Sequence, residues 1–174
     1  MRWSQLKKRI EDGFAESVRG RVEIWETRYR KAPEEELEIW VTIDAQRVAS
    51  YGYFRFEGAH YPKVRQLTLE RSLSQQQPDY RVELTSVEKA VLAALAEDDV
   101  LDPYRFQRSM AEFLNTSIDD CIASDDPVLR GLAVLDSRFG KRRLKALDAS
   151  LDVPFVSRFY KLRCEAEGIR LETK

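Results

Sequence analysis

The chain has 174 residues, with 29 Lys or Arg against 30 Asp or Glu, and its formal net charge is −1 at pH 7. A composition of 43% hydrophobic and 34% charged residues is typical of a soluble globular protein, and seven Gly and six Pro exclude a collagen-like or low-complexity chain. No apolar run reaches the ~18 residues of a transmembrane helix, and the first residues lack the apolar centre of a signal peptide. We therefore expect a cytoplasmic protein without a membrane partner.

The first predicted element is a helix near the start of the chain. Ser4 is suited to cap its first turn and Gly20 to end it. Its apolar positions recur at steps of four, the spacing of one helix face: Leu6, Ile10, Phe14 and Val18.

A set of strands is predicted next, because the apolar period changes to two between residues 21 and 56. The pattern indicates three strands, joined by a turn at 32–35 and by a shorter one at 44–46 that makes the second pair an antiparallel hairpin. The apolar positions of one face are Val22, Ile24, Leu37, Ile39, Val41, Ile43 and Val48.

Residues 65–72 and 80–84 are two further candidate strands, which would give a sheet of three to five strands. Their separator is the polar turn 75–79, but residues 64–73 fit a helix almost as well, since their apolar residues do not distinguish the two periods. We place the boundary between two regions at this turn. Residues 1–79 form the helix and sheet region, and residues 80–174 form a helical region packed with it as one compact unit.

The second half of the chain has clear helix signals. Thr85 and Glu88 have the spacing of a capping box ahead of an apolar helical pattern. Three later helices are predicted to start at Asp102-Pro103, Asp126-Pro127 and Val153-Pro154. The last two align as DPVLRGLAVLD and VPFVSRFYKLR, which indicates either degenerate HEAT-type repeats or simply the common pattern of capped helices. The fold class is therefore α+β: an N-terminal helix and antiparallel sheet followed by an all-helical C-terminal half.

Motifs that identify a reaction are missing from the sequence. The single histidine, His60, is expected in a loop, and Cys121 and Cys164 are expected as small buried apolar residues with free thiols. One His and two distant Cys cannot supply a structural zinc site, and phosphate-loop, dinucleotide and serine-elbow patterns do not occur. We predict no catalytic residue, metal site or cofactor. A hydrolase with carboxylates assembled in space, or with Cys121, stays an alternative.

A basic cluster is one of two candidate binding surfaces. The net charge is segregated along the chain: residues 1–31 carry +4, residues 81–102 carry −4 and residues 138–174 carry +5. The cluster around a predicted helix start comprises Arg138, Lys141, Arg142, Arg143 and Lys145. Such a cluster attracts phosphates, although solvated helix faces are also often basic.

An aromatic face of the sheet is the second candidate surface. If the apolar set faces the core, strand alternation places aromatic residues on the other side. The residues proposed for binding are Trp25, Tyr29, Trp40, Tyr53 and Arg55, the last two assigned to the third strand. We expect the helical half to cover Trp25 and Trp40, leaving the residues at the edge as contacts.

The chain also resembles a family of uncharacterised bacterial proteins. The resemblance rests on WSxLK at 3–7, GRVEI at 20–24, TRYR at 27–30, LDxRxGKR at 135–142 and FYxLRxEAEG at 159–168. The chain departs from the family pattern at Trp25, where histidine is expected, and at Ala45, where glycine is expected in the turn. The resemblance implies a bacterial cytoplasmic protein and assigns no role to any residue.

Three functions are compatible with these observations. The leading hypothesis is a non-catalytic binding or regulatory module that contacts a protein or peptide partner. The alternatives are a weak, electrostatic nucleic-acid-binding protein and the hydrolase described above. Partner identity and oligomeric state cannot be derived from the sequence.

Overall fold

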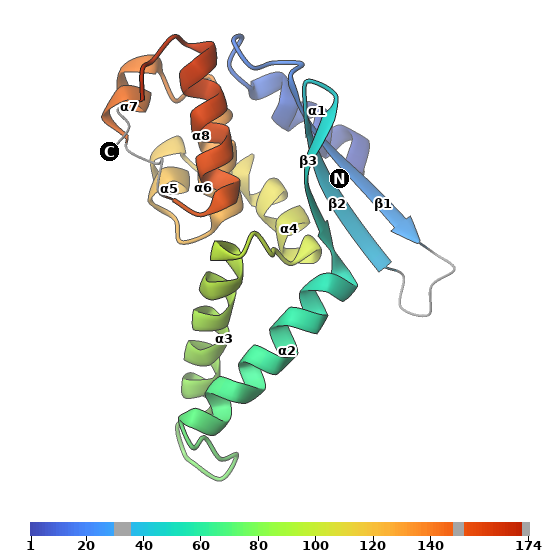
Figure 1. Cartoon of the computed structure of the whole chain (residues 1–174), viewed down its shortest axis with the longest axis vertical. Helices are drawn as coiled ribbons and strands as arrows, with labels where there is room; N and C mark the ends of the chain where they lie inside the picture. Colours follow the sequence, from blue (N-terminus) through green and yellow to red (C-terminus); the bar gives the residue numbers. More distant parts are fainter. Residues whose placement is uncertain (30–35, 148–151, 172–174) are drawn as a thin grey trace.

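The computed structural model of the chain describes residues 1–29, 36–147 and 152–171, and it confirms the predicted α+β class. A three-stranded sheet and the C-terminal helices lie side by side, and a long helical hairpin extends away from both (Figure 1). None of the helices in the described ranges is long and apolar enough to cross a membrane.

The first helix, α1 (Trp3–Gly13), is shorter than predicted. Ser4 lies inside its first turn, so the predicted cap is wrong, and Arg2 precedes the helix instead. The helix ends at Gly13 rather than Gly20, because Phe14 adopts an extended conformation and forms a β-bridge with Asp136. Backbone hydrogen bonds flank this bridge, from Ala15 N to Leu135 O (2.8 Å) and from Ser137 N to Gly13 O (2.9 Å).

The predicted antiparallel sheet is present as β1 (Val22–Tyr29), β2 (Glu36–Ile43) and β3 (Gln46–Gly52), in the order β1-β2-β3. The turn predicted at 32–35 lies outside the described residues. Between β2 and β3, Asp44 and Ala45 both have positive φ angles, 50° and 63°, as a two-residue hairpin turn requires. Glycine is the residue best suited to this conformation, which agrees with the glycine expected at position 45.

The further strands predicted at 65–72 and 80–84 are wrong, because both segments are helical. The chain leaves β3 directly into α2 (Tyr53–Glu70), so Tyr53 and Arg55 lie on a helix and not on the third strand. It returns in α3 (Tyr80–Glu97), which begins before Thr85, and Thr85 Oγ1 bonds to the carbonyl of Arg81 instead of capping. Tertiary packing selects the helix over the strand in these segments, because the apolar residues of α2 and α3 form a core between the two helices. Its buried members are Phe56, Val87, Val91 and Leu95.

The three helix starts predicted at Pro103, Pro127 and Pro154 are confirmed. The helices are α4 (Pro103–Phe113), α5 (Ile118–Ala123), α6 (Pro127–Leu135), α7 (Lys141–Ala146) and α8 (Pro154–Ala166). The Asp102 carboxylate accepts a hydrogen bond from Tyr104 N at 2.9 Å, and Asp126 accepts one from Val128 N at 2.7 Å. These side chains cap α4 and α6 as the Asp-Pro pairs predict.

The main hydrophobic core includes residues from both sides of position 79. It extends from Leu6 and Ile10 of α1, through Ile24 and Ile39 of the sheet, to Phe155 of α8. Residues 75–79 lie in the connection between α2 and α3, at the tip of the projecting hairpin (Figure 1). The hairpin therefore extends from this shared core.

A polar cluster ties the base of the hairpin to the body. Tyr51 Oη of β3 donates to Asp99 Oδ1 at 2.9 Å, and Arg158 of α8 donates to Asp99 Oδ2 at 2.7 Å. Burial and the Asp99 carboxylate raise the pKa of Tyr51. Asp99 has a φ angle of 54°, so this residue holds a left-handed conformation where α3 turns into α4.

Candidate functional site

A groove of about 850 Å³ lies between α3, α4 and the α5–α6 connection. We call it the α3–α4 groove. The volume lies in the range of ligand-binding sites. Residues that line it include Lys89, Leu92, Ala93, Ala96, Val100, Arg105, Phe106, Ser109, Asp125, Asp126, Val128, Arg130 and Val153.

Apolar side chains form the inner surface of the α3–α4 groove. Ala93 and Ala96 on α3 are small, which leaves space between this helix and α6, and Phe106 and Val128 are buried behind them. Leu92 and Val100 are half-buried; they line the groove and also pack against the hairpin core. Ala93 and Ala96 lie on the side of α3 opposite Val87, which faces α2.

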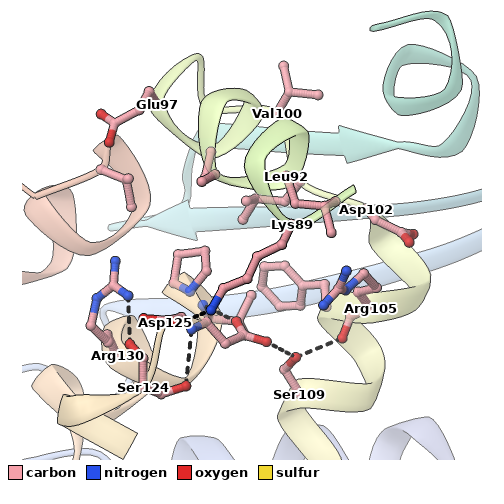
Figure 2. Close-up of a pocket in the computed structure, with 18 of the residues that line it drawn as sticks. Lys89, Leu92, Glu97, Val100, Asp102, Arg105, Ser109, Ser124, Asp125 and Arg130 are labelled. Atoms are coloured by element: carbon pink, nitrogen blue, oxygen red, sulfur yellow. Dashed lines mark hydrogen bonds and ion pairs between the residues drawn. The ribbon is translucent and has the colours of Figure 1, made fainter. Parts of the chain in front are cut away.

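An ion pair spans the mouth of the groove. Lys89 Nζ of α3 lies 2.6 Å from Asp125 Oδ2 in the α5–α6 connection, and Figure 2 shows the lysine reaching across to it. The pairing raises the pKa of Lys89 and lowers the pKa of Asp125. Both side chains are largely exposed, so the pair is screened by solvent and can open when a ligand approaches.

Three further polar side chains of the groove, those of Ser109, Asp126 and Arg130, are paired within the chain. Ser109 Oγ donates to Asp126 Oδ2 at 2.6 Å, while the other carboxylate oxygen of Asp126 caps α6. Arg130 donates to both carboxylate oxygens of Asp152, at 3.2 and 2.8 Å, and to the carbonyl of Ser124 at 2.7 Å. These contacts fix the α5–α6 connection against the groove.

The sheet places Trp25 and Trp40 on one face as predicted, opposite the buried Ile24, Ile39 and Val41. The prediction that the helices bury both tryptophans is wrong, since the helices pack on the apolar face and Trp25 is 38% exposed. The two indole rings stack at 6.4 Å between centroids, with 13° between their planes.

Cations flank this tryptophan pair. Lys7 Nζ lies 3.7 Å from the centre of the Trp25 ring, and the Arg47 guanidinium lies 5.0 Å from that of Trp40. The two indoles therefore already have cation–π partners within the chain, which leaves less ring surface for stacking a base or a sugar. Tyr29 is exposed at the end of β1. Tyr53 and Arg55 lie on α2, and Arg55 donates to the carbonyl of Ser50, which is the strand partner of Trp40.

The predicted basic cluster lies at the start of α7 and is partly neutralised. Arg138 donates to both carboxylate oxygens of Asp136, at 3.0 and 3.1 Å, and this pairing raises the pKa of Arg138. Arg143 pairs with Asp119, and Lys141 donates to the carbonyl of Glu167. Arg142 and Lys145 are exposed.

His60 lies within α2, so its expected loop position is wrong, and its ring stacks on Phe56 at 4.9 Å. Cys121 and Cys164 are buried and free, as predicted, and burial raises the pKa of the Cys121 thiol to about 11. No group of three or more His, Cys, Asp or Glu that could hold a metal ion occurs within residues 1–29, 36–147 and 152–171.

Sequence reasoning missed the α3–α4 groove, because its walls come from segments far apart in the chain. One signal was available: α3 has the small apolar residues Ala93 and Ala96 on the side opposite Val87. A helix that is apolar on two faces has two neighbours to contact. Only the fold shows that the second neighbour leaves a groove.

Comparison with curated proteins and with solved structures gave no match. A sequence model of one protein family matches residues 2–164, which is nearly the whole described chain and includes α3, α4 and the α5–α6 connection. The chain belongs to the SF0329 protein family.

Proposed function

We propose that this protein is a non-catalytic binding module that holds an apolar segment of a protein or peptide partner in the α3–α4 groove. One observation carries the proposal: a groove of about 850 Å³ with an apolar inner surface, bordered by the exposed ion pair of Lys89 and Asp125. Two buried free thiols are compatible with the bacterial cytoplasm expected from the sequence.

The lining of the groove favours an apolar ligand group. Transfer of an apolar side chain from water to a surface of Leu92, Ala96 and Phe106 is favourable by about 25 cal/mol per Å² of buried area. A carboxylate or phosphate would gain less, because Asp102 and Asp126 already occupy the N-termini of α4 and α6. Anionic ligands would also approach the acidic residues Glu88 and Glu97 on α3.

The border charges favour a peptide over a purely apolar small molecule. Lys89 and Asp125 form an exposed pair that a ligand can replace on both sides, with an acidic group for Lys89 and a basic group for Asp125. An amphipathic helix offers apolar anchors together with flanking charges of both signs, and binding in a groove is a common mode for such helices.

The arrangement supports binding more than hydrolysis. Of the described groove residues, Ser109 is the one hydroxyl that is buried, and it donates to the cap carboxylate Asp126. Asp126 in turn accepts from the backbone of α6, so this pair stabilises a helix start. Cys121 has its pKa raised by burial, which disfavours the thiolate that a nucleophile needs.

Peptide binding tests the proposal, with two neighbouring alanines as a matched pair. Ala93 and Ala94 are both exposed on α3, but only Ala93 lines the groove. Peptides selected from a random display library on the wild-type protein are synthesised, and their affinities are measured by fluorescence anisotropy. We expect Ala93→Arg to weaken binding by at least about tenfold, as loss of an anchor pocket does, and Ala94→Arg to leave it unchanged.

The selected sequences provide a second readout. We expect them to share two or more large apolar residues at helical spacing. The proposal would be overturned if Ala93→Arg and Ala94→Arg bound the peptides with equal affinity. It would also be overturned if no selected peptide bound Ala93→Arg more weakly than the wild type.

A further inference from the structure

The outer face of α2 has an exposed apolar stripe that is distinct from the α3–α4 groove. Phe54, Tyr61 and Leu69 are 49%, 62% and 69% exposed. Together with Gly58 and Arg65 they recur at steps of three or four, which places them along one face of the helix. We call these five residues the α2 stripe. It faces away from α3, because Phe56 and Leu67 take the inner side of α2.

We propose that the α2 stripe is a homodimer interface, in which α2 packs antiparallel against α2 of a second copy. A twofold axis beside Tyr61 and Pro62 places Phe54 of one chain opposite Leu69 of the other. The same axis places Gly58 opposite Arg65. Every contact then occurs twice, as in an isologous interface.

Polar groups match across this axis. Glu57 and Arg65 are absent from the ion pairs of the described hairpin, which join Lys63 to Asp98 and Arg71 to Glu83. In the dimer, Arg65 of each chain lies next to Glu57 of the other.

A backbone acceptor lies at the same point. Pro62 has no N–H, so it cannot donate the usual helical hydrogen bond to the Gly58 carbonyl. A Cβ at Gly58 would meet no atom within 4 Å, so the helix surface at this glycine has room for a second chain. The Arg65 guanidinium of the second copy therefore has a carboxylate and a carbonyl oxygen to bind.

The apolar groups match as well. A shallow hollow on α2 is lined by Tyr61, Pro62, Arg65, Gln66 and Leu69. The antiparallel register places Phe54 of the second copy over this hollow, where its ring is removed from water. The hollow and the ring that fills it belong to the same sequence, which favours a second copy over an unrelated partner.

The α2 stripe lies on the projecting hairpin, where a second copy of the chain can reach it. The distal part of the α2–α3 hairpin projects beyond the sheet and the C-terminal helices (Figure 1), so two hairpins can associate through α2 as a four-helix arrangement. The α2 helix has 18 residues and is ~27 Å long, so one face of it is smaller than a standard stable interface. A dissociation constant in the micromolar range is expected.

Charge exchange tests the pairing of Glu57 with Arg65. Sedimentation velocity of the full chain from low micromolar to about 1 mM should show a monomer–dimer equilibrium. We expect Glu57→Arg alone and Arg65→Glu alone to weaken the dimer about tenfold, and the double variant to restore most of the affinity. Arg81→Glu, the same charge change at an exposed position on α3, is the matched control and should have no effect. A chain that stays monomeric throughout, or a dimer indifferent to both single changes, would overturn the proposal.

Cysteine cross-linking tests the antiparallel register. A cysteine at position 61 lies beside the axis and should form an intermolecular disulfide under mild oxidation. Residues 54 of the two chains are ~22 Å apart in the antiparallel pair, so Phe54→Cys alone should not cross-link, whereas Phe54→Cys mixed with Leu69→Cys should. Cys121 and Cys164 are buried and give little background. Efficient cross-linking by Phe54→Cys alone would contradict the register.

Discussion

Gly131 of α6 lies directly against the ring of Phe155 in α8. A Cβ at Gly131 would come 2.5 Å from Cε1 and 2.7 Å from Cδ1 of that ring. The glycine is therefore required for the close approach of two helices, since its φ angle is an ordinary helical one. The α6 and α8 helices are the two segments whose sequences align as DPVLRGLAVLD and VPFVSRFYKLR. Their close packing depends on the absence of a side chain at Gly131 of α6.

Gly131→Ala should destabilise the protein by about 1–3 kcal/mol, because the methyl group forces the buried Phe155 ring to move. Gly58→Ala is the matched control, since it is also a helical glycine but has open space around it. The control should raise the free energy of unfolding by about 0.5–1 kcal/mol. Urea unfolding at low micromolar protein concentration measures both, and a neutral Gly131→Ala variant would contradict the close packing.

Arg163→Met should cost about 2–4 kcal/mol, because it removes a buried charge that satisfies backbone acceptors. The Arg163 guanidinium donates to the carbonyls of Val134, Leu135 and Asp136 at the end of α6, at 3.1 to 3.2 Å. Lys161→Met, at an exposed position of the same helix, should change stability by less than about 0.5 kcal/mol. Equal effects of the two changes in thermal or urea unfolding would show that the carbonyl contacts contribute nothing.

Glu11→Gln should change the pH dependence of stability in a defined direction. Burial raises the pKa of Glu11 above its ordinary value of 4.5, although the hydrogen bond from Ile24 N and the Lys7 ammonium oppose the shift. The folded state then holds the proton more tightly than the unfolded state, so the contribution of Glu11 to stability falls as the pH rises from about 4.5 through its folded pKa. Urea unfolding at a series of pH values measures this: the difference in the free energy of unfolding between wild type and Glu11→Gln should show the same fall as the pH rises.

Glu167→Gln should change the pH dependence of stability in the opposite direction in the same experiment. The Ser17 hydroxyl, with help from Arg163 and Lys141, lowers the pKa of Glu167. Its contribution is present above pH 4.5 and is lost as the pH falls through the lower folded pKa. The same pH trend for both glutamine variants would show that one of the two environments is misassigned.

Trp40→Ala should cost only about 1–2 kcal/mol, less than a fully buried tryptophan, because the helices leave this face of the sheet open. Ile39→Ala, the adjacent position on the buried face, should cost about 2–5 kcal/mol. Chemical unfolding of the two variants therefore reports the strand register. The reverse order would place Trp40 in the core.

The sheet and the Asp-Pro helices were predictable because their signals are local. Alternation of apolar residues places Ile24 and Ile39 on one face whatever the rest of the chain does, and Asp126 caps the helix that begins at the next residue. The hairpin was less predictable. Val64 and Leu67 fit both periods, and only their contact with α3 selects the helix.

The α3–α4 groove could not be predicted from the sequence, because its walls come from segments that only the fold brings together. Lys89 and Asp125 are 36 positions apart, and nothing near either residue indicates that they meet across a groove. The tryptophan face shows the reverse case. Its register was predictable, but its exposure depends on which side of the sheet the helices pack.

The β-bridge between Phe14 and Asp136 has a consequence for the order in which the chain can fold. During synthesis, the residues around Phe14 leave the ribosome long before residues 135–137, to which their backbone groups bond. The α2–α3 hairpin, by contrast, joins neighbours in sequence and can form as soon as it is made. The segment around Phe14 therefore finds its native backbone partners late, and until then its apolar residues Ile10 and Phe14 have no completed core to enter.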